Sequence, residues 1–192
     1  RNAIFSVLMP SQIEKMFPDL WVDEESEEGK NLNEAPLIRT QIERFRKKWT
    51  FSYNKVHDSQ YGDKLITTIP SLMQYQLNVI VLNFVDMLSH ARTENKMIRE
   101  LAQSEAAYRS LTRSWFQHSG TLELFRRIAD RGCKVIITTD HGTIRVDNPQ
   151  KVVGDKNTNT NIRYQLGKNG SYNTKEEFEI RDPEPAGVPS PT

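Results

Sequence analysis

The feature that most constrains the fold is the run "LNVIVLNF", Leu77 to Phe84, which is almost continuously apolar and rich in β-branched residues. Such a run predicts a central strand that is covered on both faces. The run "KVIITT", Lys134 to Thr139, has the same character. Helical periodicity between them, over Met97–Trp115 and Leu122–Ile128, completes the order strand, helices, strand. The sequence therefore predicts an α/β fold with a mostly parallel sheet flanked by helices.

Composition narrows the class of protein. The 192 residues include 26 Lys and Arg against 25 Asp and Glu, so no strong field favours nucleic acid or an anionic membrane surface. No apolar run of the sequence approaches the roughly 20 residues of a membrane-spanning helix. The single cysteine, Cys133, excludes an internal disulfide and suits a reducing compartment. We therefore expect a cytoplasmic protein without a membrane partner.

The remaining segments predict shorter elements and loops. A short helix is expected over Ser11–Phe17, with the serine as its cap, and residues 36–49 have the periodicity of an amphipathic helix. Residues 23–35 are strongly acidic, which is typical of a solvated surface loop. Beyond Asn157 the chain is polar and rich in turn residues, which predicts a long loop, and residues 182–192 are expected to form a Pro-containing tail.

Each of the two predicted strands is followed by a carboxylate and an imidazole. Asp86 and His90 follow the first strand, and Asp140 and His141 follow the second. In an open parallel sheet, ligands bind beyond the carboxyl ends of the strands. A helix directly after the first strand would place Asp86 and His90 on one face, because residues four apart share a helix face. Asp140 and His141 are adjacent, so either a turn at Gly142 aims both at one ion, or each serves one of two neighbouring ions.

Mixed carboxylate and imidazole ligands favour Zn²⁺, and less specifically Mn²⁺ or Fe, over Ca²⁺ and Mg²⁺, which prefer oxygen alone. Two such ions about 4 Å apart stabilise both the attacking and the leaving oxygen of an in-line displacement at phosphorus. Taken singly, either motif is more simply a capping or strand-end aspartate beside an unrelated histidine. Their coincidence behind two predicted strands favours a metal site. His57 and His118 lack a carboxylate at ligand spacing behind a predicted strand, so we exclude both.

The stretches "VLNFVDMLSHAR" and "ITTDHGTIRV", with "RNAIFSVLMP" and "GDKNTNTNIRY", resemble the PglZ domain of the alkaline phosphatase superfamily over nearly the whole chain. The closest likeness is to PorX-type two-component response regulators, in which a receiver domain precedes the PglZ domain. The resemblance implies a phosphoester hydrolase with two zinc ions and a threonine nucleophile. It also implies that Asp86 and His90 hold one ion, while Asp140 and His141 hold the other.

The resemblance also leads us to expect the central fragment of a single PglZ domain, without a receiver domain. It places the nucleophilic threonine upstream of Arg1 and a last histidine ligand beyond the tail, and the family usually has Gly where this chain has Val7. We therefore expect no catalytic residue within the chain, weak or partial zinc binding, and no turnover by the fragment alone. The substrate-binding candidates are four polar residues: Arg1, Asn2, Asn161 and Arg163.

The leading hypothesis is a zinc-dependent phosphodiesterase or phosphatase domain that is active in the intact regulator. The partners that the resemblance implies are a phosphoester substrate, including an oligonucleotide-like one, a sensor kinase or sigma factor, and a second copy of the chain in a homodimer. The alternative is a regulatory module whose phosphatase-like core docks a signalling or transcription partner. A third hypothesis is a hydrolase with one metal ion and Asp140 as its base.

Overall fold

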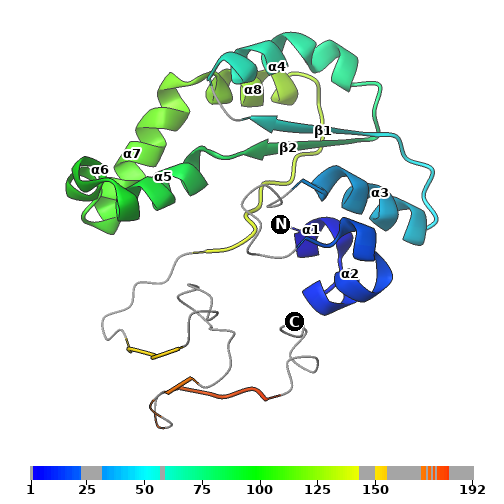
Figure 1. Cartoon of the computed structure of the whole chain (residues 1–192). Helices are drawn as coiled ribbons and strands as arrows, with labels where there is room; N and C mark the ends of the chain where they lie inside the picture. The colour runs from blue at the N-terminus through cyan, green and yellow to red at the C-terminus, as the bar shows by residue number, and fades with distance from the viewer. Residues whose placement is uncertain are drawn as a thin grey trace. The chain divides into compact units, whose positions relative to one another are not determined.

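The computed structural model describes residues 2–22, 32–56, 59–142, 150–154, 170–171, 173, 175 and 177–181. The chain divides into two compact units: unit 1 comprises residues 1–47 and 138–192, and unit 2 comprises residues 48–137 (Figure 1). Each unit is described by itself. Among the helices of the described residues, none is both long enough and apolar enough to cross a membrane.

Unit 2 is built on two parallel strands. β1 (Phe51–Val56) pairs with β2 (Leu77–Leu82), in a register that places Phe51 opposite Leu77 and Val56 opposite Leu82. The helix α4 (Ser59–Leu72) connects them, because parallel neighbours require a crossover. The predicted α/β class, with a parallel sheet flanked by helices, is confirmed. The strand predicted at Leu77 is also confirmed, and it ends two residues before the end of the apolar run.

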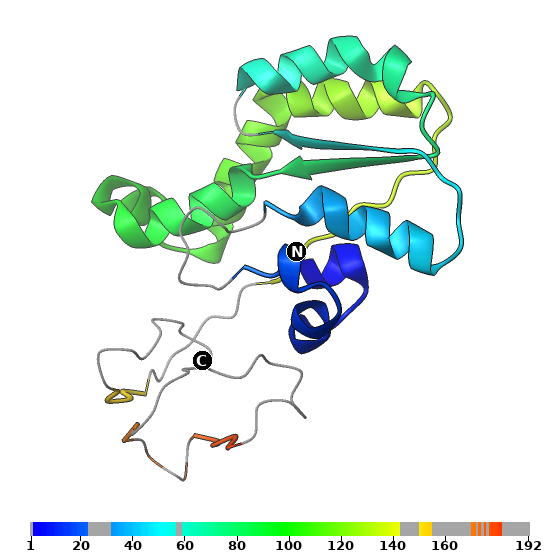
Figure 2. The ribbon, with the colours of Figure 1, turned by 45° about the vertical axis from the view of Figure 1, so that its right-hand side comes forward.

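One face of this sheet is covered by α4 and α8 (Gly120–Ala129), which lie together in both views (Figures 1 and 2). The side chains between these helices and the strands form the core of unit 2. Its buried members are Val56, Leu65, Ile69 and Leu124. Ile80 and Leu82 of β2 pack against this core, since residues two apart in a strand point to the same face. The apolar run of β2 thus supplies side chains to the helix-covered face. The prediction of a central strand covered on both faces is wrong for the described sheet, because β2 pairs with β1 alone and none of its residues is buried.

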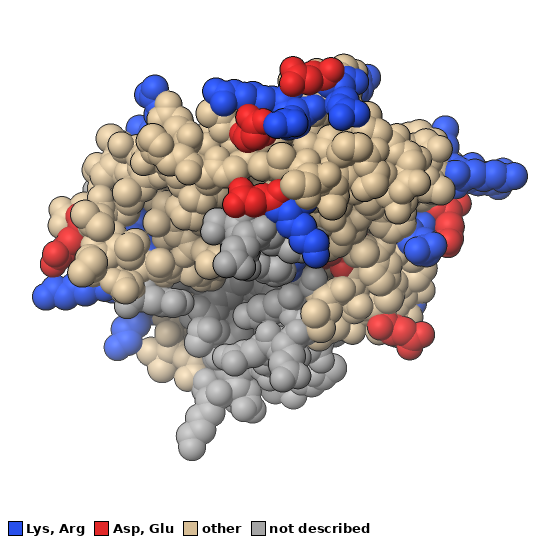
Figure 3. All heavy atoms as spheres, turned by 90° about the horizontal axis from the view of Figure 1, so that it is seen from above, with Lys and Arg blue, Asp and Glu red and all other residues tan. Residues whose placement is uncertain are grey.

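Acidic and basic side chains lie next to one another on the surface seen from above (Figure 3). On α8, Arg127 Nε donates a hydrogen bond to Glu123 Oε1 at 2.7 Å, one helical turn away. This hydrogen bond, with the charge of the carboxylate, raises the pKa of the Arg127 guanidinium above its usual value. Both side chains are exposed, so water and salt screen the pair and it contributes little to stability.

Three further helices follow β2: α5 (Phe84–Glu94), α6 (Lys96–Leu101) and α7 (Glu105–His118). The single helix predicted over Met97–Trp115 is therefore two helices. The second begins at Glu105, and its N-cap residue is Ser104, whose Oγ accepts a hydrogen bond from the Ala107 backbone N–H at 3.1 Å. The predicted break at residues 117–120 is confirmed, and Ser119 there caps α8 in the same way.

The second predicted strand, Lys134–Thr139, is wrong: these described residues lie in neither a helix nor a strand. Val135, Ile136 and Ile137 are 46%, 82% and 77% exposed. The parallel neighbour of β2 is β1, although the polar residues of β1 leave it without an apolar run. A strand is held by hydrogen bonds to a neighbouring backbone, so a β-branched run forms one only where such a backbone lies alongside.

Unit 1 contains α1 (Asn2–Ser6), α2 (Pro10–Met16), the short 3-10 helix η1 (Pro18–Leu20) and α3 (Glu34–Arg44). α1 packs against α3, and the Arg44 guanidinium donates a hydrogen bond to the Ser6 carbonyl oxygen. The helix predicted to be capped by Ser11 begins at Pro10 instead. Proline suits the first helical position, because its φ is fixed near the helical value and its missing N–H would have no partner there.

α3 confirms the amphipathic helix predicted over residues 36–49, but it ends earlier. The apolar residues of its central turns are buried, whereas Phe45 is exposed. Arg46 has a φ of 52°, in the left-handed region, and the Lys47 N–H donates to the Ile42 carbonyl oxygen at 3.0 Å. This is the Schellman arrangement that ends many helices, usually with glycine at the left-handed position. Arginine there gives no stop signal, so the periodicity extended the predicted helix too far.

Some predicted segments lie partly or wholly outside the described residues. Of the acidic loop predicted over residues 23–35, residues 23–31 are outside, whereas Glu34 begins α3 and is fully buried, so the predicted loop extends too far. The tail at residues 182–192 is also outside, as is most of the long loop predicted beyond Asn157. Near that loop, an isolated antiparallel bridge joins Val153 and Ser171.

Val7 carries backbone strain that glycine would remove. It follows α1 with a φ of 53°, in the left-handed region, where a residue with a Cβ is disfavoured by about 1–2 kcal/mol. Its side chain is largely exposed, so a substitution loses little burial. We expect Val7→Gly to raise the free energy of unfolding, measured with urea, by about 1 kcal/mol. Val7→Ala keeps the Cβ and is the control; an equal gain with alanine, or a loss with glycine, would contradict the assignment of strain.

Candidate functional site

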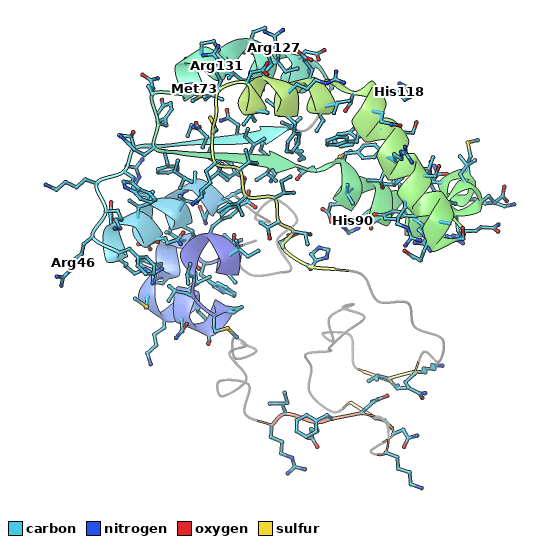
Figure 4. The ribbon with its side chains drawn as sticks, turned by 180° about the vertical axis from the view of Figure 1, so that it is seen from behind. Arg46, Met73, His90, His118, Arg127 and Arg131 are labelled. Atoms are coloured by element: carbon cyan, nitrogen blue, oxygen red, sulfur yellow. The ribbon has the colours of Figure 1, made fainter. Side chains whose placement is uncertain are left out.

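The first candidate pair, Asp86 and His90, lies on α5 directly after β2. The strand ends at Leu82 and the helix begins at Phe84, so Asp86 is in the first turn and His90 follows one turn later. His90 Nε2 lies 3.7 Å from Asp86 Oδ1, which confirms the prediction that a helix places both side chains on one face. Figure 4 shows His90 on this helix and His118 at the end of α7. The pair occupies the carboxyl end of a parallel strand, where open sheets bind ligands.

The separation within this pair fits a shared metal ion. Zinc bonds to imidazole nitrogen and carboxylate oxygen are about 2.0–2.2 Å long, so two ligands of one ion lie within about 4 Å of each other. The observed 3.7 Å meets this limit. The His90 side chain is 68% exposed and that of Asp86 is 35% exposed, so an ion can reach both from solvent. The pair supplies two of the three or four protein ligands that a zinc ion usually takes.

α5 is held against α7 by contacts along its length. Phe84 and Trp115 stack with their ring centroids 4.3 Å apart and their planes within 1°. Further along, Arg92 Nη1 lies 3.2 Å from Glu105 Oε1, to which it donates a hydrogen bond. These contacts restrain the helix that carries the pair at both of its ends. Sequence reasoning missed them, because Arg92 and Glu105 are 13 positions apart on separate helices and form no local pattern.

The second candidate pair, Asp140 and His141, lies in unit 1. A bend at Asp140 turns the two adjacent side chains toward each other, with His141 Nε2 4.0 Å from Asp140 Oδ1. This separation is at the limit for one shared ion, so the fit is looser than that of the first pair. His141 Nδ1 lies 3.2 Å from the Gly142 carbonyl oxygen. A proton on Nδ1 completes that hydrogen bond, because a carbonyl oxygen can only accept.

The local backbone also restrains this pair. Thr139 Oγ1 donates a hydrogen bond to the His141 carbonyl oxygen at 2.7 Å, across Asp140. The pair does not follow a strand, because the predicted strand at Lys134–Thr139 is wrong. The prediction that this pair lies at the end of a sheet strand is therefore wrong. The carboxylate and imidazole themselves lie close together at a bend at Asp140, whereas Gly142, where the turn was predicted, does not have a left-handed φ.

The two pairs belong to different units, and the structure describes each by itself. Within the described ranges, His, Cys, Asp and Glu side chains do not gather in groups of three or more that could hold a metal ion. Among the substrate-binding candidates, Asn2 begins α1, and its buried Oδ1 has no hydrogen-bond partner in the described part of the chain. Arg1, Asn161 and Arg163 lie outside the described residues.

The two excluded histidines have different outcomes. His118 is the last residue of α7, at a helix end as predicted. His57 lies outside the described residues, but one ground for excluding it is wrong. β1 ends at Val56, so a strand does precede His57 in the sequence. The signal that could have revealed this strand is the alternation of Phe51 and Tyr53 with polar residues.

The sequence matches a known protein family over its whole length. The family model of the BREX system PglZ alkaline phosphatase-like domain matches residues 1–192. No curated protein matches the sequence. The matched range includes both candidate pairs and both units.

Proposed function

Because the chain belongs to the PglZ family of alkaline phosphatase-like domains, we propose that it forms part of a zinc-dependent phosphoester hydrolase that acts chiefly on phosphodiesters. Membership of the family supports the class of reaction. The observation that carries the metal dependence is the pair on α5, where His90 Nε2 and Asp86 Oδ1 lie 3.7 Å apart beyond the carboxyl end of β2. Two donors of this chemistry at this separation suit one zinc ion.

The proposal gives each pair one ion. Asp86 and His90 would hold the first, and Asp140 and His141 would hold the second. Zinc, when bound, supplies Lewis acidity that neutralises phosphoryl oxygens. As ligands of these ions, the two carboxylates would be ionised and the two imidazoles neutral, because metal ligands must be deprotonated. We assign no nucleophile within residues 1–192, and the candidates for phosphate contact remain the four polar residues Arg1, Asn2, Asn161 and Arg163.

We further propose a regulatory setting for this activity. The likeness of "VLNFVDMLSHAR" and "ITTDHGTIRV" to PorX-type proteins supports a place in a cytoplasmic two-component response regulator. A sensor kinase or a sigma factor would then be a partner of the intact protein, and a homodimer its assembly. In such a protein, phosphorylation of a receiver domain would control access of the phosphoester to the metal site.

Elemental analysis of the natural protein that contains residues 1–192 tests the metal assignment. We expect about two zinc ions per chain in the wild type. The variant Asp86→Ala with His90→Ala should retain about one ion, and so should Asp140→Ala with His141→Ala, because each removes two ligands of a different site.

The matched control for these variants is Glu123→Ala with Arg127→Ala. It removes another exposed acid–base pair at the same helical spacing and should keep both ions. A wild-type protein without zinc, with its fold intact by circular dichroism, would overturn the hydrolase proposal. A docking module for a signalling or transcription partner would then be the better assignment.

A further inference from the structure

Tyr108, on α7, contacts the part of α5 that carries Asp86 and His90. The inference drawn from these contacts rests on the proposed metal function of that pair. Its hydroxyl donates a hydrogen bond to the Val85 carbonyl oxygen at 3.0 Å and accepts one from Ser89 Oγ at 2.9 Å. Val85 and Ser89 each precede one candidate ligand by a single residue. One hydroxyl from a neighbouring helix therefore spans the same turn of α5 that separates the two ligands.

This turn lies at the N-terminal end of α5. Asp86 lies in the first turn, and Asn83, the N-cap residue, makes no side-chain cap hydrogen bond. The first N–H groups of a helix lack partners within the helix, and helix ends fray. The hydrogen bonds of Tyr108 thus add restraints from another helix to the first two turns of α5.

Tyr108 is itself held in place. The Arg92 guanidinium lies over the tyrosine ring, 5.5 Å from its centroid, in a cation–π contact. The same guanidinium pairs with Glu105, one turn before Tyr108 on α7. The ring is half-buried, which further limits the positions open to its hydroxyl.

We propose that Tyr108 is a positioning residue for the metal site on α5. Its hydroxyl fixes the turn from Val85 to Ser89 and so holds Asp86 and His90 at a separation that suits one zinc ion. Tyr108 acts through the backbone and the serine of α5 and does not touch the ion. Residues that orient metal ligands without touching the ion typically strengthen metal binding by about 10- to 100-fold.

The zinc affinity of Tyr108→Phe in the natural protein tests this role. Phenylalanine keeps the ring beneath Arg92 and removes only the hydroxyl. Competition with a chromophoric chelator, at a temperature where both proteins are fully folded, should show about tenfold weaker binding of the ion that Asp86→Ala with His90→Ala loses. Amide hydrogen exchange at residues 85–90 should also be faster in Tyr108→Phe without added metal.

Two further variants separate positioning from general stability. Thr112 Oγ1 donates a hydrogen bond to the Tyr108 carbonyl oxygen at 3.1 Å, so Thr112→Val removes one hydroxyl hydrogen bond from α7 without touching α5. Zinc affinity should be unchanged in this control. Ser89→Ala should weaken zinc binding and add little to Tyr108→Phe, because Tyr108→Phe already removes the hydrogen bond with Ser89 together with the one to the Val85 carbonyl oxygen.

The possible results distinguish the two proposals. Unchanged zinc affinity in Tyr108→Phe, when wild-type binding does depend on Asp86 and His90, would overturn the positioning role and leave the proposed function standing. An equal loss of affinity in Thr112→Val would also overturn it, since the effect would then come from α7 as a whole. Wild-type binding that does not depend on Asp86 and His90 would overturn both proposals.

Discussion

Replacing Asp86 and His90 together by alanine should lower phosphodiester hydrolysis by the natural protein about 100- to 1,000-fold. A metal ion that polarises a phosphoryl oxygen contributes several kcal/mol to the transition state, and about 1.4 kcal/mol corresponds to a factor of ten in rate. The measurement is kcat/KM for bis-p-nitrophenyl phosphate with zinc supplied. The loss should appear mainly in kcat, because the ion stabilises charge that develops during the reaction.

Glu123→Ala with Arg127→Ala controls for the loss of an exposed acid–base pair from a helix surface. Its rate should stay within about twofold of the wild type, since such pairs contribute little to stability. Hydrolysis by the Asp86 and His90 double variant at the wild-type rate would refute the assignment of these side chains to the reaction. A similar fall in the control would mean that the activity responds to surface charge instead.

Leu65→Ala should lower the free energy of unfolding by about 3 kcal/mol, measured by urea denaturation followed by circular dichroism. Leu65 is 2% exposed, in the core between α4, α8 and the strands, where it belongs to the same cluster as Val56 and Leu124. Truncation removes buried methyl groups and leaves a cavity that the two helices close only partly.

Leu101→Ala is the matched control, because it makes the same chemical change within a helix of the same unit. Leu101 is 56% exposed, so its truncation should cost less than about 1 kcal/mol. Equal losses for the two variants would contradict the placement of the core between α4, α8 and the sheet. Unchanged m-values would show that both variants unfold from equally compact states.

Sequence reasoning succeeded where the structure depends on neighbouring residues. The apolar run at Leu77 predicted β2, and the spacing of Asp86 and His90 predicted their shared helix face, which the 3.7 Å separation confirms. Both features follow from local geometry: a strand repeats every two residues and a helix every 3.6. The metal-binding role of the pair remains a prediction, which the zinc analysis tests.

Sequence reasoning failed where the structure depends on segments far apart in the chain. Lys134–Thr139 has the composition of a buried strand, yet Ile136 and Ile137 are exposed and the polar strand β1 pairs with β2. Backbone N–H and C=O groups are the same in every non-proline residue, so the pairing of strands leaves little trace in composition. The end of α3 lies at a left-handed arginine, a residue type that gives no stop signal. The contacts of Tyr108 with α5 join residues far apart in the sequence.

Three features follow from the order of the amino acids: the α/β class, the strand at Leu77 and the kinds of side chain at each candidate pair. Periodicity and ligand chemistry are properties of the chain before it folds. The folded chain shows three more: β1 lies beside β2, α4 forms the crossover, and α7 restrains the helix that carries Asp86 and His90. These features depend on contacts between segments far apart in the chain. Their free energy comes from burial and hydrogen bonding that exist only when those segments meet.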